Sequence, residues 1–483
     1  FSKPSNAEAI LIGAYVNIQE DNLWGRKFLQ PLVLMTHESD DIFLSHQFWN
    51  EFNTNNVSPL NERVLAHYDK FYEAISSAND FIENFGDIES DTIYTEAVLE
   101  DMLGQAHALR GYAYQNLVNL FGEAYPDQNP DALGVPIITS VPKSSDEVYI
   151  PRATVAQVYD QIEQDYQEAI RLMNVETLDE SNYGRLSKMA VVGLLGKMYS
   201  FKGEWQNAID QYEIIINSGA FELVDTLGNA MDGLHEFGPE SIWELNYSNA
   251  TEGVADFYGE GTYNHIVQIF AARIGGWPNL FVSDYAIERF GDDPRRKEAI
   301  AMGGDTIFKL TPNPQVMNSR FDRPFTRKFV TSDRVPEYGR VPGYVANIVL
   351  MRLGDIYLMY AEALNELGRD TEALEFVNKL RKRAHYLDPE APITQEMIDE
   401  GIVYQSLSGE ALRDTIREER WRELFHEGHR WYDVQRWRIL EEELAKVPES
   451  NAGQIVFNEE DYYWPIPQIE MDANPELVQS EGY

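Results

Sequence analysis

The chain has 483 residues, of which 43% are hydrophobic and 12% aromatic, a composition typical of a globular protein with a large core. Its 80 acidic residues against 39 basic ones give a formal net charge of −41, which argues against binding to nucleic acid or to anionic surfaces. Such self-repulsion is best tolerated in salt and suggests a marine or halotolerant source. The absence of cysteine excludes disulfides, thiolate metal sites and cysteine nucleophiles. No apolar run reaches membrane-spanning length, and a start at Phe1 without a basic and apolar leader predicts a mature form.

Four amphipathic stretches in the first part of the chain predict long helices. These stretches are residues 6–19, 61–84, 97–121 and 154–173. The small residues Gly111 and Ala113 in the third stretch predict the close approach of a partner helix. The segment from Ser39 to Pro59 lacks a helical period and predicts a loop that carries aromatic and amide side chains.

Two later stretches have the spacing of a tetratricopeptide unit, in which small residues mark the crossing of two helices. They are Leu195–Ile215 and Leu353–Leu380, and a third pair combines Ala108–Gly122 with Thr154–Met173. Helix pairs of this kind stack into a curved α-solenoid, because each pair buries its apolar face only against its neighbours.

Residues 221–347 are rich in glycine, asparagine, proline and aromatic residues, with short strand-like pieces such as Ser241–Asn246. An irregular stretch of that length in a compact protein is usually functional. We therefore predict a mostly α fold in which a tetratricopeptide-like solenoid packs against an irregular, loop-rich second lobe. The predicted parts are a helical part with repeats at 1–220, the loop-rich lobe at 221–347, and a helical part at 348–483 that packs back on the solenoid.

The stretch Arg413–Trp437 alternates apolar residues with arginines and glutamates at helical spacing. Its basic side chains have acidic neighbours three or four residues away, which predicts a charge lattice on one helix face and a core on the other. Gly428 weakens the helix and predicts that a second helix follows it. The tetrad from His426 to His429 lacks the spacing of a zinc-binding H-E-x-x-H motif, so we predict no metal site there.

The segment Ile416–Trp437 resembles the C-terminal signature of the SusD/RagB family of Bacteroidetes outer-membrane lipoproteins, I-R-x-E-R-x-x-E-L-x-x-E-G-x-R-W-x-D-x-x-R-W. A second family signature is similar to Trp464–Glu470 followed by Asn474–Gln479, with Trp464 where leucine is usual. The segments Ser39–Phe43 and Asp292–Arg296 also resemble family habits.

This resemblance implies a non-catalytic glycan-binding protein that is lipid-anchored on the outer membrane and exposed at the cell surface. The acylated cysteine would precede Phe1. The implied partner is a SusC-type TonB-dependent transporter, to which the protein hands oligosaccharides. We predict no enzyme and no cofactor; the chain has neither a G-x-S-x-G motif nor a phosphate loop.

Sugar rings present flat C–H faces fringed by hydroxyls, so a binding site needs aromatic platforms with amides, carboxylates or arginines at the rim. The rings predicted as platforms are Trp49, Tyr258 and Trp277. The predicted hydroxyl partners are Asn53, Arg273 and Asn279. For each ring the alternative is a packing role in the core.

We predict a neutral polysaccharide such as a β-glucan, because the negative charge disfavours acidic polymers unless a basic patch offsets it. Arg320, Arg323 and Arg327 are candidates for such a patch. Two alternatives stay open: a RagB-like component of peptide uptake, and a helical-repeat scaffold whose concave face binds another protein. Without its transporter we expect a monomer.

Overall fold

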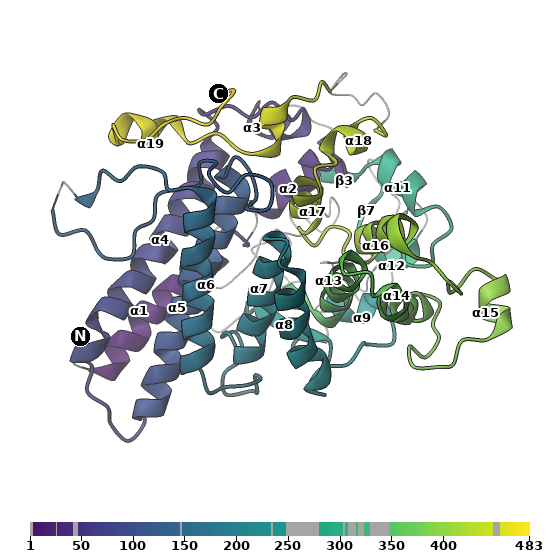
Figure 1. The fold of residues 1–483 in the computed structure, drawn as a ribbon, viewed down its shortest axis with the longest axis horizontal. Helices are drawn as coiled ribbons and strands as arrows, with labels where there is room; N and C mark the ends of the chain where they lie inside the picture. The colour runs from purple at the N-terminus through teal and green to yellow at the C-terminus, as the bar shows by residue number, and fades with distance from the viewer. Residues whose placement is uncertain are drawn as a thin grey trace. The chain divides into compact units, whose positions relative to one another are not determined.

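A computed structural model of the chain is mostly helical, as predicted, with a few short strands (Figure 1). The structure describes residues 3–25, 27–41, 47–144, 147–232, 235–247, 280–302, 305–307, 315–316, 323–328, 347–447 and 455–483. Its contacts divide into two compact units, and both are assembled from separate segments of the chain. Unit 1 comprises Phe1–Phe28, Thr54–Glu204 and Ile455–Tyr483, and unit 2 comprises Leu29–Asn53 and Trp205–Gln454. The sequential division at residues 221 and 348 stays a prediction.

Unit 1 is built from long helices that pack side by side (Figure 1). They are α1 (Pro4–Gln19), α4 (Glu62–Asn84), α5 (Glu96–Phe121), α6 (Val155–Leu172) and α7 (Lys188–Phe201). Unit 1 also contains the short helix α19 (Gln468–Ala473) and the 3-10 helices η1 (Phe85–Asp87) and η3 (Glu459–Tyr462). Helix α5 contacts α1, α4, α6 and α7. The four helices predicted from periodicity are confirmed to within two residues at each end. Side chains of Asn61, Thr95 and Thr154 cap the first turns of α4, α5 and α6, which fixes where these helices begin.

The contact between α5 and α6 depends on a glycine. A Cβ atom at Gly111 would lie 2.8 Å from the ring of Tyr166, so only hydrogen fits at this position. Next to it, the guanidinium of Arg110 lies 2.6 Å from a carboxylate oxygen of Asp165. The close helix approach predicted at Gly111 is confirmed.

The second signature segment is a core element of unit 1. The Trp464 side chain is fully buried, and its backbone N–H donates to the carbonyl of Leu120 at 2.7 Å. Its ring centroid lies 5.9 Å from that of Phe121 and 5.6 Å from that of His67. The segment therefore joins α4 to the end of α5.

Unit 2 combines short helices with two-stranded sheets. Its helices are α2 (Leu29–Met35), α3 (Gln47–Asn53), α8 (Trp205–Asn217), α9 (Leu227–Met231), α11 (Asp284–Phe290), α12 (Arg296–Ala299), α13 (Leu353–Glu366), α14 (Asp370–Ala384), α15 (Gln395–Asp399), α16 (Gly409–Glu423), α17 (Arg430–Trp437) and α18 (Leu440–Leu444). Its strands are β1 (Ser39–Asp41), β2 (Ser241–Leu245), β3 (Leu280–Val282), β4 (Ile300–Ala301), β5 (Thr306–Ile307), β6 (Gln315–Val316), β7 (Phe325–Thr326) and β8 (Ile348–Arg352). They pair antiparallel as β1 with β3, β2 with β8, β4 with β7, and β5 with β6.

The strand predicted at 241–246 is confirmed as β2, and its partner β8 leads directly into α13. Helices α13 and α14 pack together and against α16, and α13 also contacts α8. The turn between α13 and α14 contains Gly368, whose φ of 72° suits glycine. This helix pair is the one predicted from the second repeat. The first predicted repeat straddles the boundary between the units at Glu204, and the tetratricopeptide assignment stays a prediction.

The signature stretch departs from its prediction in two ways. Helix α16 ends at Glu423, before the predicted break, and both His426 (φ 62°) and Gly428 (φ 83°) adopt left-handed backbone before α17 begins. Within α16, Arg422 does pair with Glu418 at 3.2 Å, as a surface lattice requires. Glu419 and Glu423, however, are buried and bind arginines from distant parts of the chain, because the same face packs on β8 and α14.

Candidate functional site

The two-stranded β1–β3 ladder in unit 2 brings two predicted binding segments to one place. Asp41 pairs with Leu280, and Ser39 pairs with Val282. Because the strands are antiparallel, the chain that leaves β1 after Asp41 and the chain that enters β3 before Leu280 meet the same end of the ladder. The first leads to Trp49, and the second carries Trp277 three positions before Leu280.

Two of the predicted ligand residues lie on helix α3, where the sequence had indicated a loop. Trp49 is 6% exposed and Asn53 is 2% exposed, so both side chains are buried. The Trp49 ring centroid lies 6.3 Å from that of Phe52. This contact agrees with the alternative role for Trp49, packing in the core. The loop prediction over residues 47–53 is wrong, because Phe52 and Trp49 share one buried face of a short helix. In this arrangement the Trp49 ring has no open face for a sugar.

The other four predicted ligand residues, Tyr258, Arg273, Trp277 and Asn279, lie outside the residues that the structure describes. Their binding roles stay predictions. What the structure adds is the anchor point of Trp277 and Asn279, since β3 begins at Leu280.

A carboxyl group lies in the middle of the ladder. Asp40, paired with Phe281, is partly buried. Burial and the negative charge of Asp284 raise the pKa of Asp40 to about 6, and Arg323 acts in the opposite direction. Arg323, which we predicted as part of a basic patch, thus lies close enough to this end of unit 2 to act on Asp40.

The first signature segment contacts strand β1 of the ladder through His426. The Nε2 atom of His426 lies 3.0 Å from the Ser39 hydroxyl oxygen, and its ring stacks on Phe425 with centroids 3.9 Å apart. Burial lowers the pKa of His426 to about 3, so the ring is neutral at physiological pH. Just after the facing strand, the hydroxyl of Ser283 donates to the carbonyl of His37 at 2.5 Å. His426 is therefore a positioning residue for β1.

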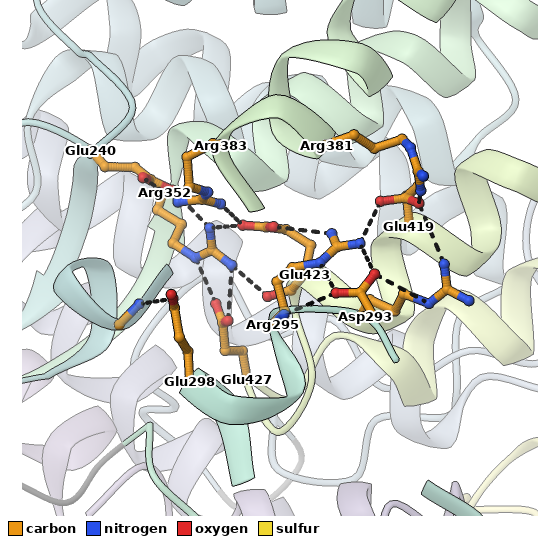
Figure 2. Close-up of polar contacts among 12 residues, drawn as sticks. Glu240, Asp293, Arg295, Glu298, Arg352, Arg381, Arg383, Glu419, Glu423 and Glu427 are labelled. Carbon is orange, nitrogen blue, oxygen red and sulfur yellow. Dashed lines mark hydrogen bonds and ion pairs between the residues drawn. The ribbon is translucent and has the colours of Figure 1, made fainter. Parts of the chain in front are cut away.

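Unit 2 also contains a buried network of arginines and glutamates (Figure 2). Its centre is Arg352, the last residue of β8, whose guanidinium lies 2.7 Å from Glu240, 2.6 Å from Glu423 and 2.9 Å from Glu427. Glu423 also contacts Arg383 and Arg295. These arginines hold the pKa of Glu423 well below its usual range in spite of the opposing effect of burial.

The network ties six segments of unit 2 together, which carry Glu240, Arg295, Lys328, Arg352, Arg383 and Glu423. Arg295 binds Asp293 at 2.8 Å and Glu419 at 2.7 Å, which anchors the start of α12 to α16. The buried ammonium of Lys328 lies 2.5 Å from Glu427 and donates to the carbonyl of Glu423 at 2.8 Å, which anchors the segment after β7. A buried charge with several hydrogen-bonded partners fixes geometry because any displacement leaves it uncompensated.

The sequence indicated the acidic half of this network through the signature, and Arg295 through its Asp-Pro-Arg motif. It missed Glu240, Arg352 and Lys328. Glu240 lies just before β2, Lys328 lies two residues after β7, and Arg352 is the last residue of β8. A hint was available in Arg352, a charged residue at the end of the apolar run from Ile348. An isolated charge next to such a run needs a buried partner.

The described residues contain no group of three or more histidine, aspartate or glutamate side chains that could hold a metal ion. None of the helices in these ranges is long and apolar enough to cross a membrane. In unit 2 the structure presents a buried network of ion pairs and a short two-stranded ladder, β1 with β3. The fold and this site define a mostly helical protein in which both signature segments are structural.

The chain belongs to the SusD family, whose sequence profile matches residues 239–483, more than half of the chain. A second profile, described as starch-binding associating with outer membrane, matches residues 3–200. The chain is 26% identical over 457 residues to the SusD-like protein P38 of Formosa agariphila, covering 89% of this chain and 82% of that protein. It is also 26% identical over 507 residues to the SusD-like protein P2 of the same organism, covering 100% and 93%.

Solved structures share the fold. A laminarin binding SusD-like protein matches with a TM-score of 0.77 and 22% identity, covering 100% of both chains. A SusD homolog from Bacteroides thetaiotaomicron matches with a TM-score of 0.79 and 21% identity, covering 100% of this chain and 98% of that one. The resemblance seen in the two signatures is thereby confirmed over the whole length.

Proposed function

We propose that this protein binds an oligosaccharide or polysaccharide outside the cell without acting on it chemically, and hands it to a SusC-type TonB-dependent transporter. Membership of the SusD family supports this function, as does the outer-membrane association named for the profile that matches residues 3–200. Attachment to the outer membrane would come from a lipid on a cysteine upstream of Phe1. Metabolic labelling of the full-length protein with a fatty acid tests that anchor.

One observation carries the location of the binding site. The segment that holds Trp277 and Asn279 enters β3 at Leu280, at the ladder end where β1 finishes at Asp41. His426 of the first signature segment contacts Ser39 and thereby fixes β1 in unit 2. A binding site next to a fixed strand suits recognition of a sugar chain, since a fixed support reduces the entropy lost on binding.

The binding energy would come from stacked rings. Burial of one aromatic ring contributes about 2–3 kcal/mol at roughly 25 cal/mol per Å², so useful affinity needs two or three platforms. Trp277 and Tyr258 are the proposed platforms, with Arg273 and Asn279 as hydroxyl partners. Asn53 is 2% exposed, so its proposed role as a further hydroxyl partner requires that α3 moves. A platform role for Trp49 requires that α3 turns its ring outward.

The proposed ligand class is a neutral glycan such as a β-glucan. A net charge of −41 repels sulfated and uronate polymers over long range. One structural relative is titled as laminarin binding, and laminarin is a neutral β-glucan. Laminarin is therefore the first polysaccharide to test.

The test is native affinity electrophoresis through gels that contain laminarin, starch, mannan, xylan, alginate or pectin. We expect retardation in laminarin for the wild type and loss of it in Trp277→Ala. Trp205→Ala on α8, a tryptophan away from the ladder, serves as the matched control and should be retarded like the wild type. Trp49→Ala separates the two roles of that ring: loss of retardation with unchanged thermal stability indicates a platform, and loss of stability indicates packing.

Migration that no polymer retards would contradict glycan binding and favour the peptide-uptake or scaffold alternatives. Retardation that persists in Trp277→Ala and Tyr258→Ala would keep the function but move the site away from the ladder end. Release of reducing ends by the purified protein would contradict a non-catalytic role.

A further inference from the structure

Unit 1 contains a pocket that the proposed glycan site does not use. It has a volume of about 270 Å³ and is lined by α4, by the segment 136–150 and by α19. Most of its wall is apolar. The apolar side chains that form the wall are Ile75, Pro136, Ile138, Val148, Ile150 and Leu477. A cavity of this size accommodates one amino-acid side chain or a small molecule.

The pocket wall is held in shape by hydrogen bonds between its elements. The hydroxyl of Tyr72 donates to the carbonyl of Pro136 at 2.8 Å, and the amide of Asn79 donates to the carbonyl of Ile138 at 2.9 Å. On the opposite side, the amide of Asn474 donates to the carbonyl of Ile150 at 3.0 Å. The side-chain amide nitrogens of Asn79 and Asn474 thus donate to backbone carbonyls of the wall, and these bonds form the cavity without a ligand.

Two carboxylates line the same pocket, Asp69 from α4 and Glu470 from α19. In the part of the chain that the structure describes, neither carboxylate makes a hydrogen bond or an ion pair. Burial raises the pKa of Asp69 to about 6, assisted by the negative charges of Glu470 and Glu73 and opposed by Lys70. Burial also raises the pKa of Glu470. Two partly buried carboxylates therefore line one cavity, and neither has an ion-pair partner among the described residues.

The chemistry of the lining selects the ligand. A carboxylate can only accept hydrogen bonds, so the ligand must donate them, and an anion is repelled. A sugar would place many hydroxyls against an apolar wall, which leaves them unsatisfied. A cationic head on an apolar stem satisfies both the wall and the carboxylates.

The surroundings of the pocket indicate where such a group would come from. Four apolar side chains with exposed fractions between 52% and 79% lie on or next to its lining elements: Leu60, Val148, Ile469 and Val478. The backbone N–H of Gln468 donates to the carbonyl of Pro59 at 2.9 Å, which brings Leu60 beside α19. Exposed apolar residues around a pocket that carries two carboxylates are typical of a surface that another polypeptide covers.

We propose that this pocket binds a lysine or arginine side chain that a partner polypeptide inserts between Asp69 and Glu470, with the exposed apolar residues around it covering the neighbouring part of that polypeptide. This interaction is separate from glycan binding at the β1–β3 ladder. The charge complementarity and the preformed depth of the pocket make the inserted cation the anchor of the contact.

The test compares two peptides that differ in one charge, acetyl-Leu-Lys-Val-amide and acetyl-Leu-norleucine-Val-amide, by isothermal titration and saturation-transfer NMR at pH 7.5. We expect the lysine peptide to bind at least fivefold more tightly to the wild type. The preference should disappear in Asp69→Asn/Glu470→Gln. It should persist in the control Glu62→Gln/Glu100→Gln, which removes two exposed charges from α4 and α5 outside the pocket.

Equal binding of the two peptides, or a preference that survives in Asp69→Asn/Glu470→Gln, would overturn the proposal. If hexylammonium binds as tightly as the lysine peptide, the proposal that the cation belongs to a polypeptide is contradicted. The double variant removes two carboxylates that lack an ion-pair partner among the described residues, so its thermal midpoint should not fall below that of the wild type; if it falls, the single variants Asp69→Asn and Glu470→Gln replace it. Retardation in laminarin gels should be the same for all these proteins, so the two proposals fail independently.

Discussion

Substitution of Glu423 by glutamine is expected to destabilise unit 2 strongly. The Glu423 side chain is fully buried; one carboxylate oxygen lies 2.6 Å from Arg352, the other lies 3.4 Å from Arg295, and the carboxylate also contacts Arg383. Glutamine keeps the shape but removes the negative charge that these guanidiniums share. Breaking a buried ion pair by removal of one partner costs about 3–5 kcal/mol. Each arginine keeps another carboxylate, so we expect a loss near the lower end, about 3 kcal/mol.

The assay is urea unfolding of the wild type and Glu423→Gln, followed by near-ultraviolet circular dichroism and tryptophan fluorescence. The matched control is Glu366→Gln, which breaks another glutamate–arginine pair of unit 2, at 2.6 Å from Arg413, in a partly exposed position. Such a pair contributes about 0–1 kcal/mol. A loss of less than about 1 kcal/mol in Glu423→Gln, equal to that of the control, would refute the view that the network holds unit 2 together.

The same carboxylate gives the pH dependence of this stability. Its pKa in the folded protein lies well below the ordinary value of 4.5. The stabilisation is therefore fully present above pH 4.5 and is lost as the pH falls from there towards the folded pKa. The wild type should lose stability below pH 4.5 more steeply than Glu423→Gln. Parallel curves for the two proteins would contradict the cause that we assign to the shift.

The remaining predictions concern the buried side chains of Glu38 and Trp464 and two helix glycines, Gly354 and Gly13. Burial raises the pKa of Glu38 to about 7, so its contribution to stability is present below pH 4.5 and is lost as the pH rises through 7; Glu38→Gln should therefore melt higher than the wild type at pH 8, and not at pH 5. Trp464→Ala should lower the free energy of unfolding of unit 1 by about 3–5 kcal/mol in urea titrations, because the fully buried indole leaves a cavity. Gly354→Ala should destabilise by about 1–3 kcal/mol, because its Cβ atom would lie 2.5 Å from the guanidinium of Arg352. Gly13→Ala, in a helix with nothing within 4 Å of the new atom, should instead stabilise by about 0.5–1 kcal/mol, and calorimetric melting of the two variants shows whether the signs differ.

The sequence predicted best where local periodicity and packing agree. Helices α4 and α5 have long apolar stripes and capping residues, so their ends follow from the chain alone. Gly111 was predicted as a helix contact because a residue without a side chain allows a second helix to approach closely. The strand β2 was visible as an alternating run at Ser241.

The predictions were weaker where long-range contacts decide. Helix α3 is only seven residues long, too short for a period to be recognised, so Trp49 was assigned to a loop. The glutamates of α16 were assigned to helical neighbours, because sequence spacing cannot show that Arg352 and Arg383 reach them from β8 and α14. The pairing of β1 with β3 joins residues more than two hundred positions apart and has no local signal.

The interleaving of the two units has a consequence for how the protein is made. Unit 1 contains Trp464, which belongs to Ile455–Tyr483, a segment that the ribosome releases after all of unit 2. Helices α1 and α4 to α7 therefore remain during synthesis with the place of that indole open to solvent, next to Phe121 and His67. The larger segment of unit 2, Trp205–Gln454, is complete before Ile455 is translated. A chaperone that protects apolar surface is thus needed most by the part of the protein that is translated earliest.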